Sequence, residues 1–386
     1  MFSISIGICV YNEEKIIRSL LNSLLNQKTT NPIKEIYVIS SACSDKTDEI
    51  IEKEFLKYPQ IILLKQEKRE GKASAINLFL KNASGDILVL ESGDTIPAED
   101  TIENLIDPFK YPKIGMVGGR PIPVNNKNTF MGFTSHLIWE LHHRLALKNP
   151  KLGELVAFRK DLEIKLPTDT AVDEAYIEAL VHEKGYELVY APRAIVNNNG
   201  PATISDFLKQ RRRIFAGHLH LKRTKRYMPS SMNKFEILKL IIEEIKFKKN
   251  NILWLSGAIL LETYGRLLGS YDFYLKKEKH AIWSVATTTK EFIPVVTHSN
   301  HVITGSPNSA IHRMKLWSDI KQNIEFTNSK IYSEAMSVSD VVLPYNKLQI
   351  MQKSSIPPLS QTSPASKNQK GLKKINKNDE ISKSPY

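Results

Sequence analysis

The sequence predicts an α/β protein in which helices flank a mostly parallel sheet, followed by amphipathic helices and a disordered C-terminal tail. Two patterns predict this class. Up to about residue 125, apolar runs of strand length alternate with stretches of helical periodicity, and such alternation is typical of parallel sheets covered on both faces. The first four apolar runs each end in a cluster of polar residues.

The elements of this first part follow from their residue patterns. The first helix is marked by apolar residues that share one helix face, namely Ile16, Ile17, Leu20, Leu21, Leu24 and Leu25. The predicted strands are residues 3–10, 35–40, 61–65 and 87–90. The helices after the second and third strands are residues 46–57 and 72–80.

The second part of the chain is richer in helix. The expected elements are helices at 129–148, 173–184 and 203–222, strands at 155–159 and 187–190, and two helical segments with apolar faces within 235–275. Gly185 is expected to end the helix that precedes it. Beyond about residue 290 the periodicity fades, and from residue 354 the Ser, Pro, Lys and Asn content predicts disorder.

These patterns divide the chain into four parts. They are an α/β domain (1–228), amphipathic helices suited to a membrane interface (229–289), a segment without assignment (290–353) and a disordered basic tail (354–386).

Charge and cysteine content narrow the class of protein. The net charge of +13 is concentrated in residues 209–226 and in the tail, and no nucleic-acid recognition motif accompanies it, so nucleic acid is not an expected partner. Cys9 and Cys43, the only cysteines, lie beside apolar runs, which predicts core thiols in a reducing compartment. The longest apolar run, residues 252–261, is about half of a bilayer span, so no transmembrane helix is expected.

Four polar clusters follow the first four strands and should meet at one rim of the sheet. In an open parallel sheet, ligands bind beyond the carboxyl ends of the strands. The clusters supply Asn12 and Glu13, Asp45, Lys72, and Glu91 with Asp94. Asn12 and Asp45 have an alternative role as helix caps. Carboxylates suit a hard divalent cation, and a lysine suits a phosphate.

Six motifs in order resemble family 2 glycosyltransferases with the GT-A (Rossmann-like) fold. They are VYNEE (10–14), Asp45, GKASAIN (71–77), ESGDTIP (91–97), VDEAYIEALVHEKGYELVYAP (172–192) and QRRRI (210–214). The last is similar to the Gln-x-x-Arg-Trp motif of membrane-associated members. The resemblance extends over residues 3–217.

The resemblance implies a site for a nucleotide-diphospho-sugar and a divalent metal, Mg or Mn. The implied nucleotide-sugar-binding residues are Val10, Asn12, Glu13, Asp45, Lys72 and Ser92. The family's Asp-x-Asp metal motif falls on residues 92–94, where Ser92 replaces the first acid. Asp94 is therefore the expected metal ligand, with Glu91 as a second acid one position before the motif.

The resemblance also implies the catalytic residues. Glu174 is expected to serve as general base, with Asp173 either orienting it or taking its place; acids favoured by a helix N-terminus are the alternative. Gln210 and Arg213 share a helix face and are expected to support the leaving diphosphate. Ile214 replaces the family's Trp. Arg211 and Arg212 are expected in a solvated or lipid-facing basic patch.

A helix between residues 129 and 148 carries His136, Glu140 and His143 at a spacing that mimics a metal face. The alternative is that these residues pack the helix or line an acceptor cleft.

The expected function is that of an inverting hexosyltransferase acting on a hydroxyl acceptor, either lipid-linked or a polysaccharide. The basic residues 222–226 precede amphipathic helices, which predicts peripheral attachment to the cytoplasmic face of a membrane. Two alternatives remain from the residues alone. Ser92 and Ile214 would suit a catalytically silent binding protein of the same fold, and a nucleotidyltransferase can share a similar sheet.

Overall fold

The computed structural model describes residues 1–247, 251–282 and 286–291, all of which belong to one compact unit. The predicted tail (354–386) and residues 292–353 of the unassigned segment lie outside the described residues. The division at residue 228 stays a prediction.

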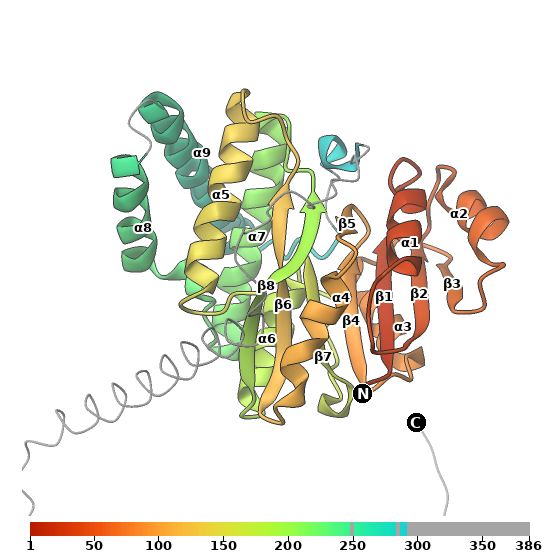
Figure 1. The fold of residues 1–386 in the computed structure, drawn as a ribbon. Helices are drawn as coiled ribbons and strands as arrows, with labels where there is room; N and C mark the ends of the chain where they lie inside the picture. The colour runs from red at the N-terminus through yellow and green to blue at the C-terminus, as the bar shows by residue number, and fades with distance from the viewer. Residues whose placement is uncertain (248–250, 283–285, 292–386) are drawn as a thin grey trace, which may run out of the picture. The chain divides into compact units, whose positions relative to one another are not determined.

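An eight-stranded sheet forms the centre of the unit (Figure 1), in the order β3-β2-β1-β4-β7-β6-β8-β5. The strands are β1 (Ile4–Val10), β2 (Ile33–Ser41), β3 (Ile61–Gln66), β4 (Ile87–Ser92), β5 (Thr95–Pro97), β6 (Ile114–Pro123), β7 (Leu155–Arg159) and β8 (Glu187–Asn198). The first four neighbours pair in parallel, as do β6 and β8, whereas β7 and β5 run antiparallel to their partners. The sheet is therefore mixed, with a parallel half at its N-terminal end.

Helices cover both faces, as predicted. They are α1 (Ile17–Leu25), α2 (Thr47–Ile50), α3 (Lys72–Asn82), α4 (Thr101–Ile106), α5 (Phe130–Ala146), α6 (Asp173–Glu183), α7 (Ile204–Lys225), α8 (Lys234–Phe247) and α9 (Ile252–Tyr271). Successive side chains of a strand point to opposite faces. Thus Ile36 of β2 packs in the core under α1 and α4, while Tyr37 packs in the core under α3 and α6. The predicted helix 46–57 is divided between α2 and a π-helical turn, Ile51–Phe55.

Three elements, β5, α4 and β6, were not predicted from the sequence. Strand β6 contains Gly118 and Gly119, which weaken any strand signal. The glycines are required by packing, because a Cβ on Gly118 would lie 2.6 Å from Leu152 and one on Gly119 would lie 2.7 Å from the Ala194 carbonyl.

Helices α8 and α9 confirm the two helical segments expected after residue 235. Gly265 and Gly269 bring α9 against α7, since a Cβ on Gly269 would lie 2.6 Å from the Arg212 carbonyl oxygen. Trp254 of α9 packs edge-on against Phe133 of α5. Among the described residues, no helix combines the length and the apolar character that a membrane crossing requires.

Candidate active site

A cavity of about 640 Å³ lies where β4 and β8 end and where α3 and α6 begin, with α5 and α7 on opposite sides. It brings together seven of the predicted site residues: Lys72, Ser92, Asp94, Asp173, Glu174, Gln210 and Arg213. Residues from four distant motifs thus line one cavity. Val10, Asn12, Glu13, Asp45 and Glu91 are not among its lining residues.

The start of α6 carries the buried Asp173 and the partly buried Glu174 beside the ammonium of Lys72. Lys72 Nζ donates a hydrogen bond to Glu174 Oε1 at 2.6 Å and lies 3.9 Å from Asp173 Oδ2. Burial disfavours the ionised form of Glu174, but the ion pair with Lys72 outweighs it and lowers the Glu174 pKa. Burial raises the pKa of Asp173 to about 7, and its Oδ1 has no partner among the described residues.

The end of β4 carries Asp94 to the cavity, and the start of β7 adds Glu154 beside it. Glu91 pairs with Leu155 across the antiparallel strands, so Glu154 falls next to Ser92. Ser92 Oγ donates to the Glu154 carbonyl oxygen at 3.0 Å. Burial, followed by the charge of Asp94, raises the pKa of Glu154 to about 7.

Glu154 was missed by sequence reasoning. Its place follows only from the antiparallel pairing of β7 with β4, and the sequence signal was a strand at 155–159 with no role assigned to the acid before it. Carboxylates forced together in this way fit a hard divalent cation, which would remove their mutual repulsion.

Glu91 does not line the cavity. Its side chain is 2% exposed, and the Thr95 hydroxyl donates to its Oε1, while Oε2 has no partner among the described residues. Burial raises its pKa to about 8. Asp94 therefore reaches the cavity, whereas the acid predicted to assist it is enclosed behind the strand.

A group of two acids and a histidine, away from Asp94 and Glu154, has the spacing of metal ligands. Within the described residues, only Asp272, Glu278 and His280 place three potential ligand atoms within 4.8 Å of one another. Arg212 donates to both carboxylate oxygens of Asp272, and His280 Nε2 lies 2.9 Å from one of them. A guanidinium thus already occupies this carboxylate and ties α7 to the residues after α9.

The loops after β1 and β2 are joined beside the cavity. Asn12 Nδ2 donates to Ser44 Oγ at 3.1 Å, and Ser44 N donates to Asn12 Oδ1 at 2.8 Å. Asp45 accepts from the backbone of Thr47 at 3.0 Å and from that of Glu14 at 3.1 Å. The side chain of Asn12 therefore holds the neighbouring loop and does not cap α1, whereas Asp45 accepts from the first turn of α2.

Gly93 connects these loops to Asp94. A Cβ on Gly93 would lie 2.9 Å from the Cys9 carbonyl oxygen and 3.2 Å from Val10 Cγ1, so the turn after β4 packs on the end of β1. Burial, then the charge of Asp94, raises the pKa of Glu13 to about 8. Lys290 pairs with the Glu13 carboxylate and donates to the Tyr11 carbonyl at 2.6 Å. No sequence signal predicted a contact over this separation.

Helix α7 presents its arginines in different directions. Arg213 Nη1 donates to the Ala171 carbonyl at 3.1 Å on the cavity wall. Arg211 also lines the cavity and pairs with Glu262 at 3.0 Å, and Arg212 pairs with Asp272. The expectation of a solvated or lipid-facing patch for Arg211 and Arg212 was therefore wrong, because Glu262 of α9 and Asp272 after it pair with them.

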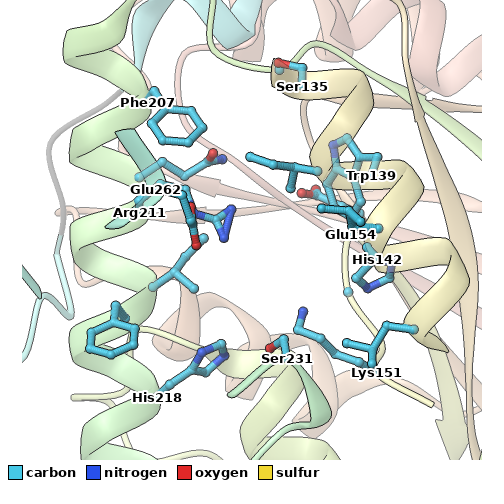
Figure 2. A pocket seen from close by; sticks show the side chains of 18 of the residues that line it. Ser135, Trp139, His142, Lys151, Glu154, Phe207, Arg211, His218, Ser231 and Glu262 are labelled. Carbon is cyan, nitrogen blue, oxygen red and sulfur yellow. The ribbon is translucent and has the colours of Figure 1, made fainter. Parts of the chain in front are cut away.

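The histidines predicted to pack or line a cleft on α5 serve in packing and not as a metal face. His136 Nε2 lies 2.9 Å from the Asn125 carbonyl oxygen, and His143 Nδ1 lies 2.9 Å from the Tyr190 hydroxyl. The face one residue earlier, with Ser135, Trp139 and His142, lines the cavity instead (Figure 2).

Known proteins are similar to this chain in sequence and in fold. Residues 5–161 match the family described as glycosyl transferase family 2, and residues 87–261 match glycosyl transferase family group 2. A mannosyltransferase from Pyrobaculum calidifontis, solved in complex with GDP-Man and Mn2+, superposes with a TM-score of 0.53 at 20% identity, covering 72% of this chain and 88% of that one.

Curated relatives are similar over the same region. The poly-beta-1,6-N-acetyl-D-glucosamine synthase of Staphylococcus aureus (strain COL) is 28% identical over 262 residues, 65% of this chain and 62% of that protein. The synthase of Staphylococcus epidermidis is 27% identical over 306 residues, 76% of this chain and 72% of that protein. The chain thus spans 62% of the length of the first of these relatives.

The sheet order and the cavity at the strand ends define a glycosyltransferase-type α/β fold of the GT-A class. The two family matches together span residues 5–261, so this part of the chain is of the glycosyltransferase family 2 type.

Proposed function

We propose that the protein transfers a hexose, with inversion, from a nucleotide-diphospho-sugar to a hydroxyl group of an acceptor. The observation that carries this proposal is that Asp94, Glu174 and Arg213, from three distant motifs, line one cavity. A nucleotidyltransferase would leave Glu174 and Arg213 without a role, and the turnover assay below separates the enzyme from a silent binding protein of the same fold.

The acids at the start of α6 are assigned to proton transfer. Glu174, kept ionised by Lys72, takes the proton of the acceptor hydroxyl as its oxygen attacks the anomeric carbon and the bond to the diphosphate breaks. Asp173, whose pKa is raised to about 7 by burial, is suited to hold the same proton near neutral pH. We assign Glu174 as base and Asp173 as the group that orients it.

The groups assigned to the diphosphate lie on α7 and at the end of β4. Arg213 and Gln210 are assigned to the departing diphosphate, where fixed donors stabilise developing negative charge. Asp94 and Glu154 would hold Mg or Mn, which would supply positive charge to the diphosphate. Val10, Asn12, Glu13, Asp45 and Ser92 are assigned to the nucleotide side, supported by the packing of the 92–94 turn on the end of β1.

The names of the relatives suggest the sugar and the acceptor. Because the synthases build poly-beta-1,6-N-acetyl-D-glucosamine, we propose N-acetylglucosamine as the transferred sugar and a polysaccharide as the acceptor. A lipid-linked acceptor is the alternative.

We further propose that α9 rests on the cytoplasmic face of a membrane as a peripheral contact. Leu253, Leu260 and Leu267 recur every seven residues and are 83%, 70% and 62% exposed. Such an exposed apolar stripe, in a chain whose α7 ends in basic residues, suits an anionic lipid surface.

A donor-turnover assay tests the enzymatic proposal. The full chain is incubated with nucleotide-diphospho-N-acetylglucosamine and GDP-mannose, with Mn²⁺ or with a chelator, and release of the nucleoside diphosphate is measured. We expect metal-dependent release that Asp94→Asn abolishes and that Glu154→Gln reduces about tenfold or more, while the exposed control Asp100→Asn behaves as wild type. No release from any donor, or wild-type release by Asp94→Asn, would refute the proposal.

A further inference from the structure

Helices α5 and α7 face each other across the cavity and present ring side chains to it. Ser135, Trp139 and His142 stand on one face of α5, and His218 projects from α7 toward them (Figure 2). Lys151, from the loop before β7, lies between the two imidazoles in the same view. This part of the cavity is not used by the proton-transfer or diphosphate residues.

His142 is buried, and its ring nitrogens make no hydrogen bond of normal geometry. Its side chain is 9% exposed, and within the described residues the Lys151 backbone is a nearby group that favours the protonated ring. The ring packs edge-on against Trp139, with centroids 5.1 Å apart, and its centroid lies 6.2 Å from that of the Tyr190 ring. Buried polar groups are nearly always hydrogen-bonded in native proteins. A poorly satisfied imidazole beside a cavity therefore points to a ligand that can hydrogen-bond it.

Burial disfavours charge around this part of the cavity, which favours an uncharged ligand. Burial keeps His142 and His218 neutral, because it lowers both pKa values well below the ordinary range. Glu262 pairs with Arg211 at 3.0 Å and with Arg266 at 2.8 Å.

Lys151 differs from these arginines, because the nearby Glu178 carboxylate accepts hydrogen bonds from Leu152 N and from the Tyr227 hydroxyl. Burial lowers the pKa of Lys151, and the charge of Glu178 is the main influence in the opposite direction. Because burial disfavours the charged amine, this part of the cavity suits hydroxyl groups, which match the neutral imidazoles, and the Trp139 ring offers an apolar face.

We propose that the cavity between α5 and α7 is a carbohydrate subsite, in which His142 and His218 hydrogen-bond hydroxyl groups of the acceptor sugar and Trp139 contacts its apolar face. The proposal rests on the proposed function, because it assigns the acceptor of that reaction to the neutral half of the same cavity. It commits to a neutral sugar and not to a lipid phosphate.

Binding of β-linked N-acetylglucosamine oligosaccharides to the full chain, measured by calorimetry, tests this subsite without requiring turnover. His142→Phe keeps the ring packing but removes both polar atoms, so affinity should fall roughly fivefold while the melting temperature stays equal or rises. His218→Phe should weaken binding similarly, and His142→Gln should restore part of it. His143→Phe is the matched control: it lies on the same helix, bonds Tyr190 and should bind the oligosaccharide as wild type does.

The outcomes separate this proposal from the enzymatic one. Failure of the wild type to bind the oligosaccharides, or equal affinity in wild type and both Phe variants, would overturn the subsite. The subsite would also be overturned if the two Phe variants lost affinity for a polyprenyl phosphate in detergent while their oligosaccharide binding stayed unchanged. Binding of a nucleoside diphosphate with Mn²⁺ is measured in parallel. Its absence would count against the proposed function, and its presence in His142→Phe would show that the donor side is intact.

Discussion

Lys72 Nζ, at the start of α3, donates a 2.6 Å hydrogen bond to Glu174 Oε1, at the start of α6, across 102 residues of sequence. The pair is only partly exposed, with side-chain exposures of 23% and 20%. Asp173 is buried beside it, so one ammonium is shared by two carboxylates. Positive charge here both stabilises the fold and sets the ionisation of the assigned base.

Lys72→Met should destabilise the protein in a pH-dependent way. The substitution leaves Asp173 and Glu174 buried without their cation, which costs about 3 kcal/mol when both are ionised. In the wild type, the lowered Glu174 pKa means that the pair stabilises the fold above the ordinary carboxyl pKa and loses this contribution as pH falls through the lowered value.

In the Lys72→Met variant, stability changes with pH in the opposite direction. Its carboxyl pKa values are raised, so stability is lost as pH rises, and the deficit should be larger at pH 8 than at pH 5. Urea unfolding at the two pH values measures it, with the exposed Lys68→Met as control. An equal deficit at both values would contradict the assignment.

Glu91→Gln should remove part of the pH dependence of stability. Burial raises the Glu91 pKa to about 8. The residue therefore contributes fully below its ordinary pKa, and the contribution is lost as pH rises through about 8. Linkage gives a loss of about 2 kcal/mol between pH 6 and pH 8, which the amide avoids.

Chemical denaturation in chelator at several pH values measures this difference, with the exposed Glu99→Gln as control. Parallel wild-type and Glu91→Gln curves would show that the carboxyl is not buried as described. Unchanged Mn²⁺ dependence in the variant is also expected, because Glu91 does not line the cavity.

Arg213→Lys should lower turnover while nucleoside diphosphate binding is retained. Lysine keeps the charge but loses the planar fork that matches phosphate oxygens. Loss of one well-placed transition-state donor costs about 100-fold in kcat. Steady-state donor turnover measures it, and Arg223→Lys at the exposed end of α7 is the matched control. Equal loss in both variants would point to a general charge effect and away from a specific contact.

The stripe on α9 should govern membrane binding. Replacing Leu253 and Leu260 by Ser removes exposed apolar area that contributes about 1.5 kcal/mol or more per leucine when buried, so affinity for anionic vesicles should fall at least tenfold, about 1.4 kcal/mol. Vesicle flotation measures binding, and Leu147→Ser, 57% exposed at the end of α5, is the control. If the double variant still floats with the vesicles, or if it loses a dimer that the wild type forms, the stripe binds another partner.

Sequence patterns were most successful where structure is local. Strand β1, helix α3, strand β7 and the helix end at Gly185, with φ of +77°, were predicted because each depends on residues close along the chain. The motif order also identified seven of the residues that line the cavity. Strand β6 was missed because its glycines serve distant neighbours, and Glu91 was misplaced because its neighbour Thr95 encloses it.

The sequence by itself determined the α/β class, the alternation of buried faces and the set of polar residues at the strand ends, because backbone periodicity and turn chemistry are local properties. Only the tertiary structure decided which of them meet. The antiparallel pairing of β7 with β4 places Glu154 beside Asp94. The rotation of α5 about its axis makes His142, and not His143, line the cavity. The chain after α9 places Lys290 in contact with Glu13. Such contacts depend on strand direction, helix rotation and chain return, which no short stretch of sequence encodes.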